Sequence, residues 1–233
     1  EFIQNEIEQI IVDKNKSGIF ALIMCKVTIF IPVYLVISLF CPKIQAQNGE
    51  LRCLKSLNQI ESTHGFSEFV SNTTVALGAA VPLSMGTLTI IQQDDDLLKK
   101  SIYVGTSLAI DFAATYALKY AVNRPRPYIT YPDEIHAVAF ESSASFPSGH
   151  TSFAFATATS LSIAYPKWYV IVPTYAWACT VGYSRMNLGV HYPTDVLAGA
   201  ALGAGSAWLS WKINQWYWKK RENKKLIGLQ AYL

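Results

Sequence analysis

The sequence predicts an all-α protein, a multi-pass transmembrane helical bundle. Hydrophobic residues make up 51% of the 233 residues and charged residues 15%, whereas a soluble domain carries roughly 25% charged residues. Several apolar stretches approach the length of about 20 residues that a helix needs to cross a bilayer. We therefore expect six spans, or five if the first apolar run is a cleaved signal peptide.

The first apolar run, residues 19–40, allows two interpretations. It can be a membrane span, although Lys26 and Pro32 interrupt it. It can also be the apolar centre of a secretory signal peptide that starts at Met24 and is cleaved after Ala46. In either case residues 1–46 are an N-terminal targeting or anchoring segment, and residues 47–72 are expected to form a polar extracytoplasmic segment.

The expected transmembrane domain covers residues 73–211 and is followed by a basic cytoplasmic tail, residues 212–233. The candidate spans are Thr73–Ile91, Ser101–Val122, His150–Tyr165, Trp168–Tyr183 and Thr194–Trp211. The last three are short or rich in small residues, which is typical of helices that pack against one another in a membrane.

The positions of the basic residues give the expected orientation. Lysine and arginine cluster in residues 212–225, and such loops stay preferentially in the cytoplasm. Alternation of the spans then places residues 123–149 and 184–193 on the outer side. Basic residues are uncommon on the outer side, yet three arginines lie there: Arg124, Arg126 and Arg185. Their position indicates a role other than setting the topology. The net charge of +3 is too small to indicate nucleic-acid binding.

Two polar motifs lie at the outer ends of these helices. In "KYAVNRPRP" the cations Lys119 and Arg126 stand where Pro125 ends a helix, although two cations there could simply extend to the membrane interface. In "FPSGH" a helix begins after Pro147, and the free N–H groups of a first helical turn can bind an anion. Alternatively, the motif is a helix cap and its histidine is incidental.

A third motif, "SRMNLGVHYPTD", combines a histidine with a carboxylate. His191 and Asp195 are four residues apart, and Pro193 suits the first turn of a helix. A carboxylate bound to one imidazole nitrogen fixes the tautomer and leaves the other nitrogen as a nucleophile. The alternative is a capping interaction beside an interfacial histidine, but Arg185 lies in the same motif.

Together the motifs predict a site for a tetrahedral oxyanion, of which phosphate is the commonest. All three are expected at one membrane face, where they bring together three cations, a helix N-terminus, two histidines and one carboxylate. We expect no metal and no cofactor, because no carboxylate cluster could hold Mg²⁺ and no Cys-x-x-Cys pair indicates zinc.

The motifs Lys-x6-Arg-Pro, Pro-Ser-Gly-His and Ser-Arg-x5-His-x3-Asp resemble the three-part signature of the type 2 phosphatidic acid phosphatase superfamily, in the family's order and without departure. The resemblance covers residues 73–211. It implies that His191 attacks phosphorus, that Asp195 orients this histidine, and that His150 protonates the leaving oxygen. It also implies that five residues hold the phosphoryl oxygens: Lys119, Arg126, Ser148, Gly149 and Arg185.

The resemblance implies a membrane-embedded, metal-independent lipid phosphate phosphatase. Its active site would face the extracytoplasmic side of the inner (cytoplasmic) membrane, and its partners would be the bilayer and a phosphorylated lipid. The candidate substrates are phosphatidic acid, phosphatidylglycerol phosphate, undecaprenyl pyrophosphate and lipid A phosphates. The loop 123–147 is the expected selectivity element. Arg124, outside the signature, is expected to assist the site or to contact the headgroup.

Two other functions are compatible with the pocket. Vanadate-dependent haloperoxidases resemble this group and hold vanadate in the same kind of pocket, but they are larger soluble proteins, and the apolar runs argue against this assignment. A non-catalytic lipid-binding membrane protein would not need both histidines and Asp195. The sequence leaves the oligomeric state open.

Overall fold

The computed structural model describes residues 45–230, and every regular element among them is helical. The elements are α2 (Gln45–Asn58), a short 3-10 helix η1 (Glu61–Thr63), α3 (His64–Gln92), α4 (Asp95–Val122), α5 (Pro127–Thr130), α6 (Gly149–Ala164), α7 (Trp168–Asn187) and α8 (Pro193–Gln230). The expected span at residues 19–40 lies outside the described residues. Among the described residues, those from residue 50 onward form one compact unit that holds the bundle.

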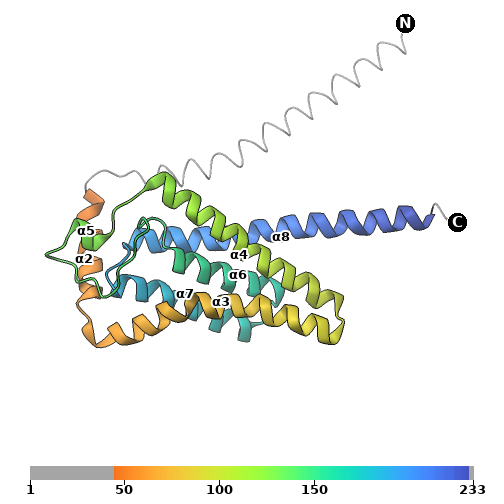
Figure 1. Cartoon of the computed structure of the whole chain (residues 1–233), viewed down its shortest axis with the longest axis horizontal. Coiled ribbons are helices and arrows are strands. Elements are labelled where there is room, and N and C mark those ends of the chain that lie inside the picture. Colours follow the sequence, from red (N-terminus) through yellow and green to blue (C-terminus); the bar gives the residue numbers. More distant parts are fainter. Residues whose placement is uncertain (1–44, 231–233) are drawn as a thin grey trace, which may run out of the picture. The chain divides into compact units, whose positions relative to one another are not determined.

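Five long helices make up the bundle, and α6 lies at its centre. It packs against α3, α4, α7 and α8, while α3 also packs against α4 and α7. Successive helices run in opposite directions, so that α3, α6 and α8 begin at the end where α4 and α7 finish (Figure 1). The helix α5 and the loop before α6 lie at this end, which we call the loop end.

The helix boundaries follow local sequence signals. The Asp94 side chain caps α4 by accepting hydrogen bonds from the N–H groups of Asp96 and Leu97, at 2.8 and 3.2 Å. The same helix finishes at Val122, followed by Asn123 in the left-handed conformation with φ 46°. Pro193 opens α8, as expected.

Four helices, α3, α4, α7 and α8, are longer than the apolar runs predict, and α3 and α8 differ most. The helix α3 begins at His64 rather than Thr73, and α8 continues through the basic residues to Gln230. In the added part of α3, the polar residues Ser67 and Ser71 are buried, because they face other helices rather than lipid. These serines lower the mean hydropathy of residues 64–72, so the apolar pattern of the sequence did not predict this part of the helix.

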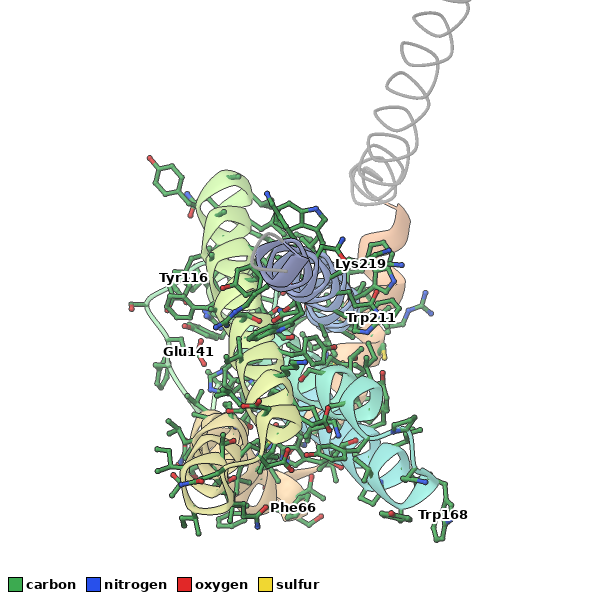
Figure 2. The ribbon with its side chains drawn as sticks, turned by 90° about the vertical axis from the view of Figure 1, so that its right-hand side faces the viewer. Phe66, Tyr116, Glu141, Trp168, Trp211 and Lys219 are labelled. Carbon is green, nitrogen blue, oxygen red and sulfur yellow. The ribbon has the colours of Figure 1, made fainter. Side chains whose placement is uncertain are left out.

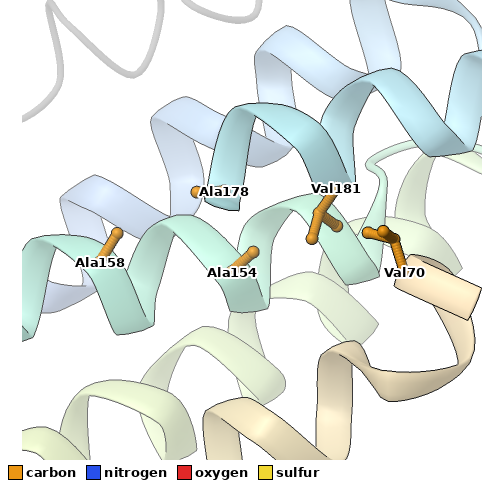
Figure 3. Close-up of a cluster of buried hydrophobic side chains, with 5 residues drawn as sticks. All are labelled: Val70, Ala154, Ala158, Ala178 and Val181. Atoms are coloured by element: carbon orange, nitrogen blue, oxygen red, sulfur yellow. The ribbon is translucent and has the colours of Figure 1, made fainter. Parts of the chain in front are cut away.

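Small residues allow α6 to approach its neighbours closely. A Cβ atom at Gly203 would lie 2.1 Å from the carbonyl oxygen of Ser152, and one at Gly199 would lie 2.6 Å from that of Ser148. On the other side of α6, Ala154 belongs to a cluster of small buried side chains (Figure 3). These contacts fix where the N-terminus of α6 stands relative to the start of α8.

The outer surface of the bundle is strongly apolar. Large hydrophobic side chains point away from the bundle, among them Leu83, Ile90 and Phe112, which are 70, 80 and 61% exposed. Within the described residues, one stretch, Glu61–Gln92, combines the length and the hydropathy of a membrane span. The other long helices carry polar residues on their inner faces, which lowers their mean hydropathy.

Candidate active site

His191 lies in the turn between α7 and α8, and its side chain is 1% exposed. Its Nδ1 is 3.6 Å from Oδ2 of Asp195, and its Nε2 is 3.3 Å from Nη1 of Arg126. Because an arginine can only donate, the neutral imidazole accepts at Nε2 and carries its proton on Nδ1. This tautomer, inferred from the contacts, turns the lone pair of Nε2 toward a cationic pocket, as a nucleophile requires.

The turn that carries His191 depends on a glycine. Gly189 has φ 71°, and a Cβ there would lie 2.9 Å from the carbonyl oxygen of His136. Asn58 supports the turn from outside, because its Nδ2 donates to the carbonyl oxygens of His136 and Asn187, at 2.8 and 2.9 Å. Helix α2, the loop and the end of α7 are thus joined beside His191.

Asp195 is fully buried in the first turn of α8 and both of its carboxylate oxygens are occupied. Arg124 donates to Oδ1 at 2.6 Å, while Ser145 Oγ and the N–H of Tyr192 donate to Oδ2 at 2.5 and 3.0 Å. Arg124 also pairs with Glu50 of α2 at 3.0 Å and lies over the ring of Tyr192. The carboxylate beside His191 is therefore held in place from several sides. Arg124, which lies outside the three motifs, is one of the residues that hold it.

Two buried arginines form the centre of the anion pocket. Arg126 and Arg185 are each 1% exposed and come from the first and third motifs. The carboxylate of Glu141 bridges them: its Oε2 accepts from Arg126 at 2.6 Å, and its Oε1 accepts from Arg185. The imidazole Nδ1 of His150 is 4.0 Å from the same Oε1. In Figure 2, Glu141 points from its loop toward the helices.

The remaining residues of the signature surround this pocket. Lys119 is 8% exposed and donates to the carbonyl oxygen of Ala144. A Cβ at Gly149 would lie 3.8 Å from Cε of Lys119, so the start of α6 stands next to the lysine. The hydroxyl of Ser148 is 2.8 Å from that of Thr151 and does not cap the helix backbone.

Burial and neighbouring charges determine the protonation states of His191 and Glu141, the two site residues that lie in loops. Burial lowers the pKa of His191 to about 4, although the neighbouring carboxylate of Asp195 opposes this shift. Burial alone would raise the pKa of Glu141, but the charges of Arg185 and Arg126 prevail and lower it to about 2. At neutral pH the imidazole is therefore uncharged and the carboxylate is ionised.

The structure brings together all of the site residues expected from the sequence. They lie at the loop end: Lys119, Arg126, Ser148, Gly149, His150, Arg185, His191 and Asp195. Sequence reasoning missed the contacts of Glu141, Ser145 and Glu50. Glu141 stood only as one polar residue of the expected selectivity loop, and Glu50 belongs to no motif.

The fold and the site define a class of protein, a helical membrane protein with a buried histidine–aspartate pair beside a cationic pocket. The chain matches the family model of the PAP2 superfamily over residues 100–219, more than half of its length. It belongs to this superfamily, and the resemblance seen in the three motifs is confirmed.

Two curated relatives illustrate the similarity. The chain is 29% identical over 194 residues to an undecaprenyl-diphosphatase of Sulfolobus acidocaldarius, an alignment of 79% of this chain and 89% of the relative. It is 34% identical over 109 residues to a lipid A 1-phosphatase of Rhizobium etli, covering 43% of this chain and 44% of that protein.

Solved structures show the same fold. The transmembrane PAP2-type phosphatidylglycerolphosphate phosphatase of Bacillus subtilis matches with a TM-score of 0.64 and 24% identity, over 81% of this chain and 95% of that one. LpxE of Aquifex aeolicus matches with a TM-score of 0.59 and 26% identity, over 70 and 94%.

Proposed function

We propose that this membrane protein hydrolyses a lipid phosphate or pyrophosphate through a phosphohistidine intermediate, without a metal ion. The observation that carries the proposal is the position of His191. Its Nε2 faces a pocket of two buried arginines, while a fixed carboxylate lies behind its Nδ1. A neutral nucleophile beside fixed positive charge is the arrangement that phosphoryl transfer requires.

In the first step, Nε2 of His191 attacks phosphorus. A P–N bond forms as the bond to the lipid oxygen breaks, and His150 donates a proton to that oxygen. Positive charge then develops on the imidazole, and Asp195 stabilises it through Nδ1. Arg126 and Arg185, together with Lys119, balance the charge of the phosphoryl oxygens.

In the second step, the P–N bond breaks. His150, now neutral, removes a proton from water, and the hydroxide equivalent attacks phosphorus to release inorganic phosphate. His191 returns to its neutral form. His150 gives up one proton in the first step and regains one from water in the second, so the cycle needs no further acid or base.

The proposed substrate is a lipid because of where the pocket lies. The pocket is at one end of helices whose outer surfaces are apolar, so a headgroup can enter it while its acyl chains stay in hydrocarbon. Phosphatidic acid, phosphatidylglycerol phosphate, undecaprenyl pyrophosphate and lipid A phosphates all offer a terminal phosphoryl group. The names of the relatives support this class of substrates.

The proposed location is the inner (cytoplasmic) membrane, with the loop end on the extracytoplasmic side. The basic residues 212–225 favour the cytoplasm for the far end of α8. The helices α3, α4, α6, α7 and α8 supply five spans, and residues 19–40 add a sixth if they are retained.

Phosphate release from a panel of purified lipid phosphates tests this function. His191→Ala should lower turnover by at least about 1,000-fold, because the nucleophile is lost. His136→Ala is the matched control, since His136 lies at the same end with an exposed side chain. As part of the selectivity loop it can change the order of preferred substrates, but its replacement should not abolish turnover. The assay contains EDTA. Appreciable turnover by His191→Ala, or a strict need for Mg²⁺, would contradict the proposed mechanism.

A further inference from the structure

Glu141 occupies the place that the mechanism assigns to the phosphoryl group. Its two carboxylate oxygens bind Arg126 and Arg185, and it lies 4.0 Å from His150. A carboxylate and a phosphoryl group make the same paired contacts with arginine. The carboxylate of the chain itself therefore stands in for the substrate anion.

The hydrogen bonds of Arg126 leave no free donor for a second anion. Its Nε donates to the carbonyl oxygen of Ser143 at 2.8 Å, and Nη1 faces Val190 O at 2.9 Å and His191 Nε2 at 3.3 Å. Its Nη2 donates to Glu141 at 2.6 Å and lies 3.2 Å from Ser143 Oγ. All five N–H groups of this guanidinium are engaged. A phosphoryl oxygen can bind Arg126 only when a present partner leaves.

Arg185 has one N–H group, at Nε, that makes no hydrogen bond to the described residues. Its Nη1 donates to Ser71 and its Nη2 to Glu141. Its buried Nε has no hydrogen-bond acceptor among the described residues. A buried N–H without an acceptor is costly, so Arg185 keeps one hydrogen-bond donor that Glu141 does not use.

The attachment of Glu141 lets its side chain leave while its backbone stays. The Tyr128 hydroxyl donates to the carbonyl oxygen of Glu141 at 3.0 Å and accepts from its N–H at 3.3 Å. The carboxylate itself is held by the two arginines, and the side chain is 26% exposed. A rotation of this side chain toward solvent would open the pocket without unfolding the loop.

We propose that Glu141 is an internal competitor, a carboxylate that closes the anion pocket between turnovers and that every phosphate ligand must displace. This inference rests on the proposed function for its biological meaning. Displacement costs the same free energy for each ligand, so Glu141 weakens the binding of all oxyanions by one common factor.

A competing carboxylate would benefit the enzyme by keeping unproductive oxyanions out of the pocket. A bilayer presents many phosphodiester headgroups, and each turnover leaves inorganic phosphate behind. Both are oxyanions that two buried arginines would otherwise retain. A competing carboxylate on the loop keeps weak ligands out of the pocket and helps to release inorganic phosphate. Enzyme turnover loses nothing by this, since tight binding of a substrate or product in its ground state does not speed the reaction.

Equilibrium binding of inorganic phosphate and of dimethyl phosphate to the purified full-length protein tests this proposal, by titration calorimetry at pH 8. Glu141→Gln removes the charge at nearly constant shape and should tighten both dissociation constants by about tenfold or more, which corresponds to about 1.4 kcal/mol. The ratio of the two constants should not change. Glu134→Gln is the matched control, because it removes a charge from the same loop at an exposed pair with Lys55.

A second variant covers the case in which Glu141→Gln does not fold. Tyr128→Phe keeps the carboxylate and both arginines but removes the hydroxyl that holds the backbone of Glu141, and it should tighten phosphate binding by a smaller factor. Unchanged or weaker binding in a folded Glu141→Gln protein would overturn the proposal, as would equal tightening by Glu134→Gln. If Glu141→Gln does not fold, unchanged or weaker binding by Tyr128→Phe overturns it. Because binding needs no turnover, failure of lipid hydrolysis would count against the proposed function alone.

Discussion

Burial sets the charge of His191. Most histidines titrate near neutral pH, whereas the low pKa of this one, about 4, keeps it neutral throughout the physiological range. A neutral imidazole has the lone pair that attack on phosphorus requires. The site therefore needs no general base to prepare its nucleophile.

This charge state predicts the acid side of the pH profile. As the pH falls through about 4, His191 gains a proton and loses its lone pair, so kcat/KM should decline there and not near pH 6.5. The measurement is kcat/KM for a soluble phosphomonoester, divided by the fraction of substrate dianion, whose second pKa is about 6. A residual acid limb near 6.5 would show that the nucleophile has an ordinary histidine pKa.

Single residues differ in how well the sequence predicts them. The signature residues could be placed together because each lies at a helix end and all of those ends share one face. Glu141 could not be placed, because its contact with Arg185 joins positions 44 residues apart through an irregular loop. Glu50 likewise reaches Arg124 from a helix that shows no motif.

At the scale of helices, the contact between α6 and α8 holds the two halves of the site in register. The N–H of Ser148 donates to the carbonyl oxygen of Asp195 at 3.0 Å, directly where Gly199 allows the helices to meet. His150 and His191 are carried by these two neighbouring segments. Their separation therefore depends on how closely α8 approaches α6.

A glycine substitution tests this dependence. Gly203→Ala should destabilise the protein by about 1–3 kcal/mol, as overpacking does, and should lower activity by moving Asp195 relative to His150. Gly205→Ala is the matched control, since nothing lies within 4 Å of its added methyl group. Thermal unfolding in detergent and phosphate release are the readouts. Equal melting temperatures for the two variants would show that the close approach does not matter.

Helix positions were predicted better than helix lengths. Each expected span from residue 73 onward coincides with a helix, because apolar length is a strong signal. The extensions of α3 and α8 were missed, because buried serines and a basic end lower the hydropathy of residues that are nevertheless helical.

At the scale of the molecule, alternating helices bring three separate motifs to one end of the bundle. The sequence predicts this gathering from the lengths of the apolar runs alone. The contact of Arg126 with His191 agrees with it, as does the carboxylate of Glu141, which Arg126 and Arg185 share. Fold and family are established together, since the PAP2 match covers residues 100–219. The chemistry proposed for this end of the bundle depends on a covalent bond between phosphorus and Nε2 of His191.

Trapping the intermediate tests that step most directly. The protein is mixed with lipid phosphate that carries ³²P in its terminal group, quenched in alkali within milliseconds, digested and mapped. We expect label on the peptide that contains His191, stable in alkali and lost in acid, and no label in His191→Ala. Label on His150 or on a hydroxyl or carboxyl side chain, or rapid turnover with no labelled protein, would contradict the account.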